Sequence, residues 1–444
     1  MFKDSNDKST RSVNPEDAHA TSVVDRRTLF VSAAGMCAVP LFSKVGQAAS
    51  PGPNLEAVQS DAKSLIGNYG SWASQLAPNP PELSFRRDKW DDIDVWRDLA
   101  RAKAAELIAS PVLDDPVEVR ELGEQRVDDL DITHLSWQLP YGRETQAILL
   151  KPAGATGPLP GVLGLHDHGG NKYFGKRKIT STGSDVHPLI QEHQREYYGG
   201  RAWANELAKR GYAVLVHDTF TFASRRVLFD DMATIPWGAC KTEGKSDEDP
   251  EDASNIAAYN AWASEHEHIM AKSLFSAGTT WPGVFLAEDR IALGVLGSRP
   301  NVDAARLGCA GLSGGGLRTV YLGGLDPRVR CAVCVGFMST WNDFVLHKSY
   351  THTWMTYTPL IARYLDFPEI LGMRVPLPTM TMSCREDSLY TLPEMEKADR
   401  ILQDIFAKAG FRDHYSGRFY AGGHKFDQSM HLDAFHWFDR WLKT

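Results

Sequence analysis

The sequence contains no uninterrupted run of about 18 or more apolar residues, the length that an α-helix needs to cross a bilayer. A membrane-spanning helix is therefore not expected. The chain also has no excess of positive charge, because 48 Lys and Arg face 56 Asp and Glu, for a net charge of −8. Nucleic acids and anionic membrane surfaces would gain no electrostatic attraction, so neither is expected as the main partner.

Cysteines are few, with 6 in 444 residues. Four of them lie in short apolar runs that predict buried strands, where Cys acts as a small hydrophobic side chain: Cys309, Cys331, Cys334 and Cys384. Cys331 and Cys334 are three positions apart on one expected strand, so they point to opposite faces and cannot easily form a disulfide. We expect no disulfide framework and no redox or zinc site at Cys331-x-x-Cys334.

Repeats and low-complexity tracts are also missing. The chain is 43% hydrophobic and 23% charged, as in ordinary globular proteins. Its length allows one large domain or two to three smaller ones.

The first 50 residues differ from the rest. A polar segment leads to the pair Arg26-Arg27, then to a short apolar stretch, residues 29–42, and then to the small residues Gly46-Gln47-Ala48. This order resembles a twin-arginine export signal with a cleavage site near Ala48. We therefore expect residues 1–48 to be removed and the protein to end in the bacterial periplasm or outside the cell. A disordered tail or a short amphipathic helix is the alternative.

Strands alternate with helices along the remaining chain. Apolar periodicity predicts strands at 132–139, 145–151, 161–165, 212–217, 306–311, 330–335, 379–383 and 416–420. Helices are predicted at 91–110, 202–210, 254–276, 281–296, 392–409 and 429–442. Such alternation predicts an α/β fold with a doubly wound, mostly parallel sheet. We divide the chain into a helical N-terminal extension, residues 49–124, and a catalytic domain, residues 125–444.

The strongest motif is Gly311-Leu312-Ser313-Gly314-Gly315, which lies between a predicted strand and a predicted helix. A sharp strand–turn–helix with this pattern is a nucleophile elbow, which lifts the Ser313 hydroxyl above the sheet. Glycines are needed there because neighbouring backbone approaches closely. A purely structural turn is the alternative.

A serine nucleophile needs a histidine base, and the base needs an acid that orients it. Among the histidines after Ser313, His424 lies in a glycine loop between the last strand and the last helix. The acid is expected at the end of the preceding strand, where Asp387 is preferred to Glu386. Asp343 is a weaker alternative.

The negatively charged oxygen of the reaction intermediate needs backbone N–H donors. One is expected from Gly314, which follows the nucleophile, and the other from Gly169 and Gly170 in the loop after the strand 161–165. A metal is not expected, because His166-x-His168 has no clustered third ligand. We expect His266-Glu267-His268 to be a solvated helix surface, since residues i and i+2 of a helix face apart.

These residues resemble the α/β-hydrolase superfamily, and within it the acetyl xylan esterase and dienelactone-hydrolase-like branch. The matching pieces are His168-Gly169-Gly170, the Gly311–Gly316 elbow, Asp387-Ser388-Leu389-Tyr390 and Gly423-His424. The resemblance spans about residues 125–444 and implies an α/β-hydrolase fold with a Ser-His-Asp mechanism. Two departures weaken its bearing on the substrate. Ser313 stands where dienelactone hydrolases have Cys, and the Gln that often follows the Ser of acetyl xylan esterases is missing.

Three long segments follow strand ends: residues 171–200, 219–250 and 337–366. Long loops at such positions commonly form lids and binding walls. Tyr173, Trp341 and Trp354 are therefore candidate substrate-binding residues, with packing in a cap as the alternative. The basic residues between Lys172 and Lys178 are expected to be a solvated loop.

Together these features predict an exported serine hydrolase that cleaves a carboxylic ester through an acyl-enzyme. The expected partner is a small-molecule or carbohydrate ester, such as an acetyl or other short acyl ester of a carbohydrate or aryl alcohol. No cofactor is expected. The alternatives are a peptidase or amidase of the same fold, and a non-catalytic binding protein on a hydrolase scaffold. The acyl group, the alcohol and the oligomeric state stay open.

Overall fold

A computed structural model describes residues 63–113, 116–247 and 251–443. The predicted export signal lies outside these residues. Within them, nine strands form one sheet: β1 (Val119–Val127), β2 (Leu130–Trp137), β3 (Thr145–Pro152), β4 (Leu159–Leu165), β5 (Ala213–His217), β6 (Val302–Leu312), β7 (Val329–Val335), β8 (Thr379–Cys384) and β9 (Tyr415–Tyr420).

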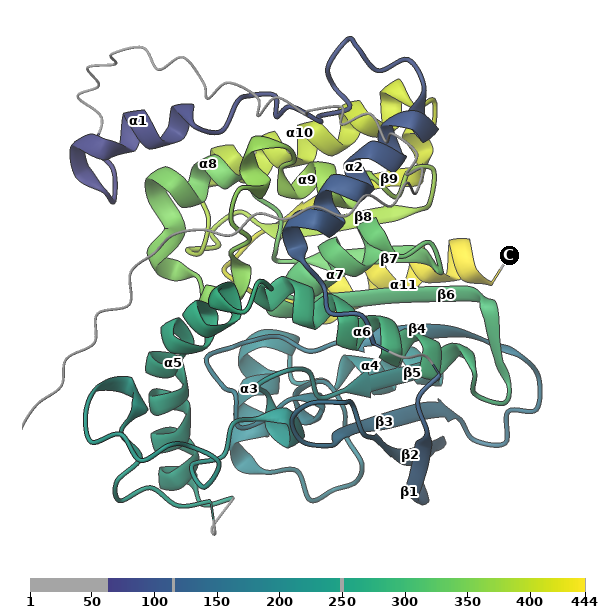
Figure 1. The fold of residues 1–444 in the computed structure, drawn as a ribbon. Helices are drawn as coiled ribbons and strands as arrows, with labels where there is room; N and C mark the ends of the chain where they lie inside the picture. The colour runs from purple at the N-terminus through teal and green to yellow at the C-terminus, as the bar shows by residue number, and fades with distance from the viewer. Residues whose placement is uncertain (1–62, 114–115, 248–250, 444) are drawn as a thin grey trace, which may run out of the picture. The chain divides into compact units, whose positions relative to one another are not determined.

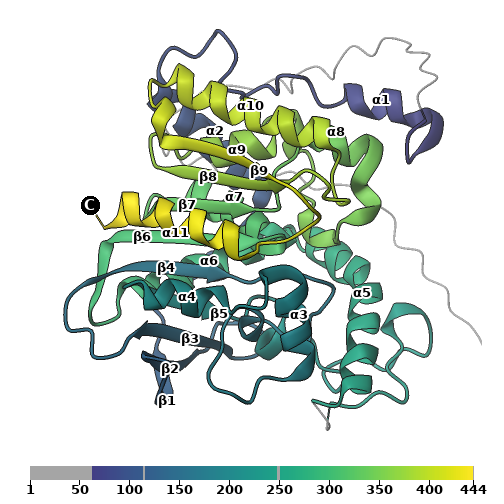
Figure 2. The same ribbon diagram turned by 180° about the vertical axis from the view of Figure 1, so that it is seen from behind.

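Helices cover both faces of this sheet, while α1 lies apart from it (Figures 1 and 2). The helices of the described residues are α1 (Gly70–Gln75), α2 (Ile93–Ile108), α3 (Pro188–Tyr198), α4 (Trp203–Lys209), α5 (Ala253–Ser276), α6 (Trp281–Gly297), α7 (Gly314–Leu325), α8 (Trp341–Asp343), α9 (Phe367–Gly372), α10 (Leu392–Lys408) and α11 (Gln428–Leu442). Helices α2, α6, α7, α9 and α10 contribute to the hydrophobic core on one face, and α4 and α11 to the core on the other.

The strand order is β1-β2-β3-β5-β4-β6-β7-β8-β9. Along this order, the pairs β1–β2, β2–β3 and β3–β5 are antiparallel. Every later pair, from β5–β4 to β8–β9, is parallel. The prediction of a doubly wound, mostly parallel sheet is therefore confirmed. Each predicted strand and helix is present, with ends that differ by a few residues.

The elements that the sequence did not predict include strand β1 and helix α3, besides the short helices α1, α8 and α9. Strand β1 is exposed along most of its length, so it has no alternating apolar pattern. Helix α3 buries polar side chains, His193 and Gln194, together with Ile190 and Tyr198, so its buried face does not look apolar. Periodicity detects only elements whose buried face is hydrophobic.

The segment before the sheet packs into the hydrophobic core on one face of the sheet. Trp96, Ala100, Ala104 and Ile108 of α2 are fully buried in the core that α6 and α7 also line. The side chain of Asp92 caps this helix by accepting hydrogen bonds from the Asp94 and Val95 amides. Helix α2 therefore covers one face of the sheet.

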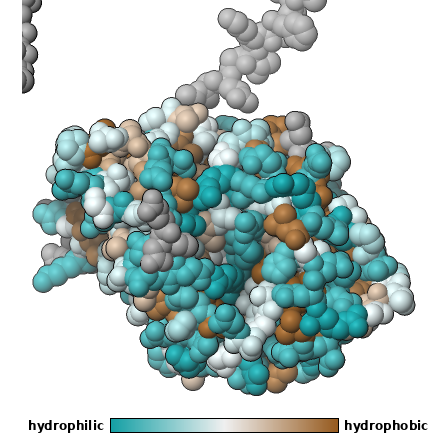
Figure 3. All heavy atoms as spheres, turned by 90° about the horizontal axis from the view of Figure 1, so that it is seen from below, coloured by the Kyte–Doolittle hydropathy of each residue, from teal (hydrophilic) through white to brown (hydrophobic). Residues whose placement is uncertain are grey.

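The surface has a mixed character. The face in Figure 3 is mostly hydrophilic, and its hydrophobic residues stand singly or in small groups. In the part of the chain that the structure describes, no helix has both the length and the hydropathy needed to cross a membrane.

The described cysteines are unpaired, and Cys331 and Cys334 belong to the cores on opposite faces of the sheet, as predicted.

Candidate active site

Ser313 occupies the sharp turn between β6 and α7. Its backbone lies at φ 58° and ψ −117°, a strained conformation for a residue with a side chain. A hydrogen bond from the Ser313 amide to the Val335 carbonyl, 2.9 Å, joins the turn to the end of β7. The turn needs its glycines, because a Cβ on Gly315 would overlap the Leu165 carbonyl oxygen and one on Gly316 would overlap that of Val335.

His424 lies in the loop between β9 and α11, where it contacts the acid. Its Nδ1 is 2.6 Å from Asp387 Oδ2, and the Asp387 side chain is 1% exposed. The other oxygen of Asp387 accepts a hydrogen bond from the Leu389 amide, 3.0 Å away, which fixes the carboxylate. The Nε2 of His424 is buried and has no hydrogen-bond partner within the described residues. This nitrogen is the one that a reacting hydroxyl would need.

The two other candidate acids have different partners. Glu386 is exposed and accepts a hydrogen bond from the Gly422 amide. Asp343 is buried and accepts hydrogen bonds from Ser339 and Thr391. Neither carboxylate contacts His424, so Asp387 alone among the three is placed to orient the imidazole.

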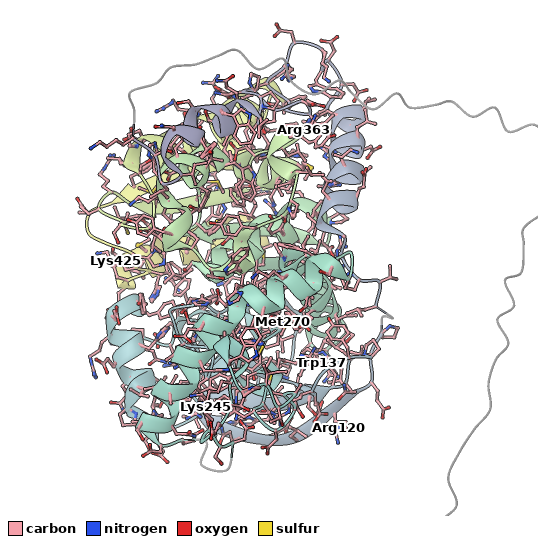
Figure 4. The ribbon with its side chains drawn as sticks, turned by 60° about the vertical axis from the view of Figure 1, so that its left-hand side comes forward. Arg120, Trp137, Lys245, Met270, Arg363 and Lys425 are labelled. Atoms are coloured by element: carbon pink, nitrogen blue, oxygen red, sulfur yellow. The ribbon has the colours of Figure 1, made fainter. Side chains whose placement is uncertain are left out.

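Ser313 and His424 line one cavity of about 470 Å³, a size typical of small-molecule sites. Its other walls come from the glycine loop after β4, from α3, from α5 and from the segment 350–354. Residues that line it include Gly169, Gly170, Tyr197, Glu267, Tyr350 and Trp354. In Figure 4, Lys425, the residue after His424, lies where the yellow C-terminal segments approach the teal segments below them.

A second, smaller cavity of about 30 Å³ opens beside Ser313. Its exposed surface is mostly apolar and includes Phe222, Phe285, Leu317, Phe337 and Met355, although polar residues such as Arg318 and His352 also line it. This volume holds about two water-sized groups. Ser313 therefore stands between a narrow apolar pocket and a wider, more polar cavity.

The glycine loop approaches the turn through His168. A Cβ built on Gly314 would lie 3.0 Å from the His168 amide nitrogen, so these two backbone segments are in contact. The Gly170 amide donates a hydrogen bond to His168 Nδ1, 3.0 Å away. Of the three amides expected from the sequence, Gly170 is therefore already engaged, and the His168 amide, which was not predicted, lies against Gly314.

The ring of His168 is held by Glu267 of α5. Its Nε2 is 2.9 Å from Glu267 Oε1, so the ring carries its proton on Nε2. The same carboxylate pairs with Lys172 at 2.7 Å and accepts a hydrogen bond from the Trp354 amide at 3.2 Å. Burial alone raises the pKa of Glu267, but the His168 hydrogen bond and the Lys172 charge outweigh it and lower this pKa to about 2. In its ionised form, Glu267 thus connects α5 to the glycine loop and to the segment 350–354, which are three walls of the cavity.

Two expectations about charged segments are wrong. His266 and Glu267 are buried instead of solvated, because the glycine loop and the segment 353–356 cover this part of α5. Lys172 and Lys178 are buried as well, each with carbonyl or carboxylate partners in neighbouring segments. Helical spacing alone could not reveal these contacts, since Glu267 and Lys172 meet partners from distant parts of the sequence and Lys178 meets a loop that folds back beside it.

The three candidate aromatic residues have different environments. Trp354 lines the large cavity and is 42% exposed. Trp341 is a core residue instead, since its ring stacks on Phe367 with centroids 4.0 Å apart. Tyr173 likewise packs in a separate hydrophobic cluster with Phe174 and Tyr259. Two further residues of the segment 337–366 were not among the candidate binding residues: Tyr350 lines the large cavity, and His352 lines both cavities.

Searches against known proteins give a consistent picture of the fold, although no family model matches the sequence. The predicted hydrolase YtaP of Bacillus subtilis (strain 168) is 25% identical over 330 residues, which cover 74% of this chain and 93% of YtaP. A predicted acetyl xylan esterase from Bacteroides fragilis superposes with a TM-score of 0.54 at 15% identity, covering 77% of this chain and 78% of that one. A glucuronoyl esterase from Solibacter usitatus superposes with a TM-score of 0.52 at 14% identity, covering 78% and 91%.

Proposed function

We propose that this chain, which has the α/β-hydrolase fold that its sequence predicted, is a serine hydrolase that cleaves carboxylic esters. One observation carries the proposal: Ser313, in its strained turn, lines the same cavity as His424, whose Nδ1 contacts the buried carboxylate of Asp387. A degenerate binding scaffold would have no reason to maintain the strain at Ser313, which costs about 1–3 kcal/mol. The hydrolase name of YtaP and the esterase names of the structural neighbours agree with this choice.

The proposed chemistry proceeds in two halves. Ser313 attacks the ester carbonyl carbon while His424 Nε2 takes its proton, and the imidazolium then protonates the departing alcohol. Water attacks the acyl-enzyme in the second half with His424 again as base, which releases the acid and restores Ser313. Asp387 holds Nδ1 of the ring and stabilises the imidazolium throughout. The amides of Gly314, His168 and Gly169 would bind the oxyanion. In this set the His168 amide takes the place of the Gly170 amide, which donates to His168 Nδ1 instead.

The two cavities suggest how an ester would be oriented. The pocket of about 30 Å³ suits a short acyl group such as acetyl, because it is apolar and has little room. The larger cavity of about 470 Å³ would take the alcohol. Trp354 and Tyr350 at its wall offer exposed aromatic surface, 42% and 71% exposed, on which a sugar or aryl ring can pack. We therefore propose a short acyl ester of a carbohydrate or aryl alcohol as substrate.

The test is the hydrolysis of p-nitrophenyl acetate, butyrate and octanoate by wild type and by Ser313→Ala. We expect turnover that falls with acyl length and disappears in the variant. Activity that survives Ser313→Ala would refute the nucleophile. p-Nitroacetanilide, an amide, is assayed beside the acetate ester, and faster cleavage of the amide would favour the peptidase or amidase alternative.

A fluorophosphonate probe separates enzyme from binding protein, because it labels only an activated serine. Failure of wild type both to hydrolyse any ester and to react with the probe would favour the binding protein.

We further propose export through the twin-arginine route, on the sequence of residues 1–48. Replacement of Arg26 and Arg27 by Lys should leave uncleaved protein in the cytosol, and unchanged export of that variant would contradict this route.

A further inference from the structure

Lys178 is a fully buried lysine that no step of the proposed reaction uses. It ends the short 3-10 turn Lys176–Lys178, and its side chain is 0% exposed. The ammonium Nζ donates hydrogen bonds to the Asp167 carbonyl at 2.9 Å and to the His168 carbonyl at 2.8 Å. Burial of an ammonium is costly, so its position against two backbone carbonyls calls for an explanation.

Both carbonyls belong to peptide groups of the glycine loop. The Asp167 carbonyl and the His168 N–H form one peptide group, and the His168 carbonyl and the Gly169 N–H form the next. In a trans peptide the oxygen and the hydrogen point in opposite directions. The ammonium therefore lies behind the two N–H groups assigned to the oxyanion, of which the His168 amide contacts Gly314. No acceptor for either N–H occurs in the described part of the chain.

A charged donor at a peptide oxygen has two effects on the N–H at the other end. It draws electron density toward the oxygen, which makes the N–H a stronger donor, as in cooperative hydrogen-bond chains. It also prevents rotation of the peptide plane, so the N–H keeps pointing at the substrate oxygen on which negative charge develops. His166 Nδ1, 3.0 Å from the same Asp167 carbonyl, adds a neutral contact there.

We propose that Lys178 is a positioning residue for the oxyanion hole, whose ammonium orients and polarises the His168 and Gly169 peptide groups. The proposal rests on the proposed function, because it assigns a role in forming the oxyanion. Lys178 does not contact the substrate. It acts through the backbone, and it should therefore affect the rate of the chemical step more than the binding of the ester.

The charges around Lys178 decide when it is protonated. The Asp167 carboxylate, itself held by Tyr198 and His193, lies 3.7 Å from Nζ. Burial lowers the pKa of Lys178 to about 8, against the opposing effect of the Asp167 and Asp218 charges, and Lys172 lowers it further. The Phe222 ring, 5.0 Å away, and neutral His166 complete the surroundings. The ammonium is thus present at neutral pH and is lost as the pH rises through about 8.

The experiment compares Lys178→Met with Lys176→Met as a matched control. Lys176 lies in the same turn and also pairs with a buried carboxylate, Asp218 at 2.7 Å, but it does not touch the glycine loop carbonyls. Removal of a whole oxyanion donor costs about 100- to 1,000-fold in kcat, so weakening two donors should cost about 10- to 100-fold. We expect this loss in kcat for p-nitrophenyl acetate in Lys178→Met, with KM changed less than about threefold. The control should stay within about threefold in both.

A tetrahedral inhibitor and the pH profile supply readouts that a merely structural role would not move. A trifluoromethyl ketone, which binds as an oxyanion, should bind Lys178→Met more weakly by about the same factor as the loss in kcat/KM. The kcat of wild type should fall as the pH rises through about 8. Lys178→Arg, which keeps its charge, should shift this fall to higher pH.

The outcomes are separable. A folded Lys178→Met protein with kcat within about threefold of wild type overturns the proposal. If this variant does not fold, a wild-type kcat that is constant from pH 7 to 10 overturns it, and a fall that Lys178→Arg displaces supports it. Failure of the proposed function would appear differently, as wild-type protein that neither hydrolyses esters nor reacts with fluorophosphonate.

Discussion

Glu267→Gln tests whether a buried carboxylate holds the cavity walls together. The change keeps the shape of the side chain and removes the charge that pairs with Lys172 at 2.7 Å. The carboxylate is 6% exposed, so solvent cannot replace the lost partner. Breaking a buried ion pair from one side costs about 3–5 kcal/mol of unfolding free energy.

The pKa of Glu267 gives an independent value. Its ordinary value is 4.5 and the folded value is about 2, a difference worth roughly 3 kcal/mol at neutral pH. Because the folded pKa is the lower one, this stability is present above about pH 4.5 and is lost as the pH falls toward 2. At pH 3.5 the unfolded carboxyl is mostly protonated while the folded one is still ionised, which removes about 1.4 kcal/mol.

Urea denaturation of wild type and Glu267→Gln at pH 7 and pH 3.5 measures both quantities. We expect the variant to be about 3 kcal/mol less stable at pH 7 and the gap to narrow by about 1.4 kcal/mol at pH 3.5. Equal stability at pH 7, or a gap that does not change with pH, would refute the reasoning. Glu265→Gln, an exposed position on the same helix, is the control and should change stability by less than about 0.5 kcal/mol.

Five further variants test the site and its corrections. Asp387→Asn should lower kcat by about 10⁴-fold, because His424 would lose its correct tautomer. Glu386→Gln should keep kcat within about threefold, since the Glu386 carboxylate bonds to the Gly422 amide and not to His424. Equal effects of the two variants on ester hydrolysis would contradict the assignment of the acid. Trp341→Ala should lower the unfolding free energy by about 3–5 kcal/mol in thermal or urea unfolding, because the Trp341 ring is buried on Phe367. Trp354→Ala should raise KM for an aryl or sugar ester with little change in stability. The reverse pattern would restore Trp341 as a substrate contact. Gly315→Ala should lose both activity and stability because its Cβ would overlap the Leu165 carbonyl, and a stable, active variant would show that the turn is looser than described.

The sequence alone determined the architecture and the order of the candidate catalytic residues. Apolar runs that form buried strands and the glycines around Ser313 are local signals, and each is read within about a dozen residues. They predicted the mostly parallel sheet, the turn at Ser313 and the loop position of His424. The hydrogen bond between His424 and Asp387 agrees with the acid preferred from the sequence.

Tertiary structure alone decided which residues surround Ser313, His424 and Asp387. Glu267 and Lys178 look like solvated charges in the sequence, yet both are buried. Glu267 is covered by segments distant in the chain, whereas Lys178 folds back onto the Asp167 and His168 carbonyls, about ten positions before it. Trp341 and Tyr173 look like cavity residues, yet they pack in hydrophobic clusters. The amide nearest to Gly314 is that of His168, one residue before the predicted pair. Periodicity and spacing report the neighbours along a chain, whereas burial and side-chain partners depend on how the chain folds back on itself, as in the contact between His168 and Glu267, 99 positions apart.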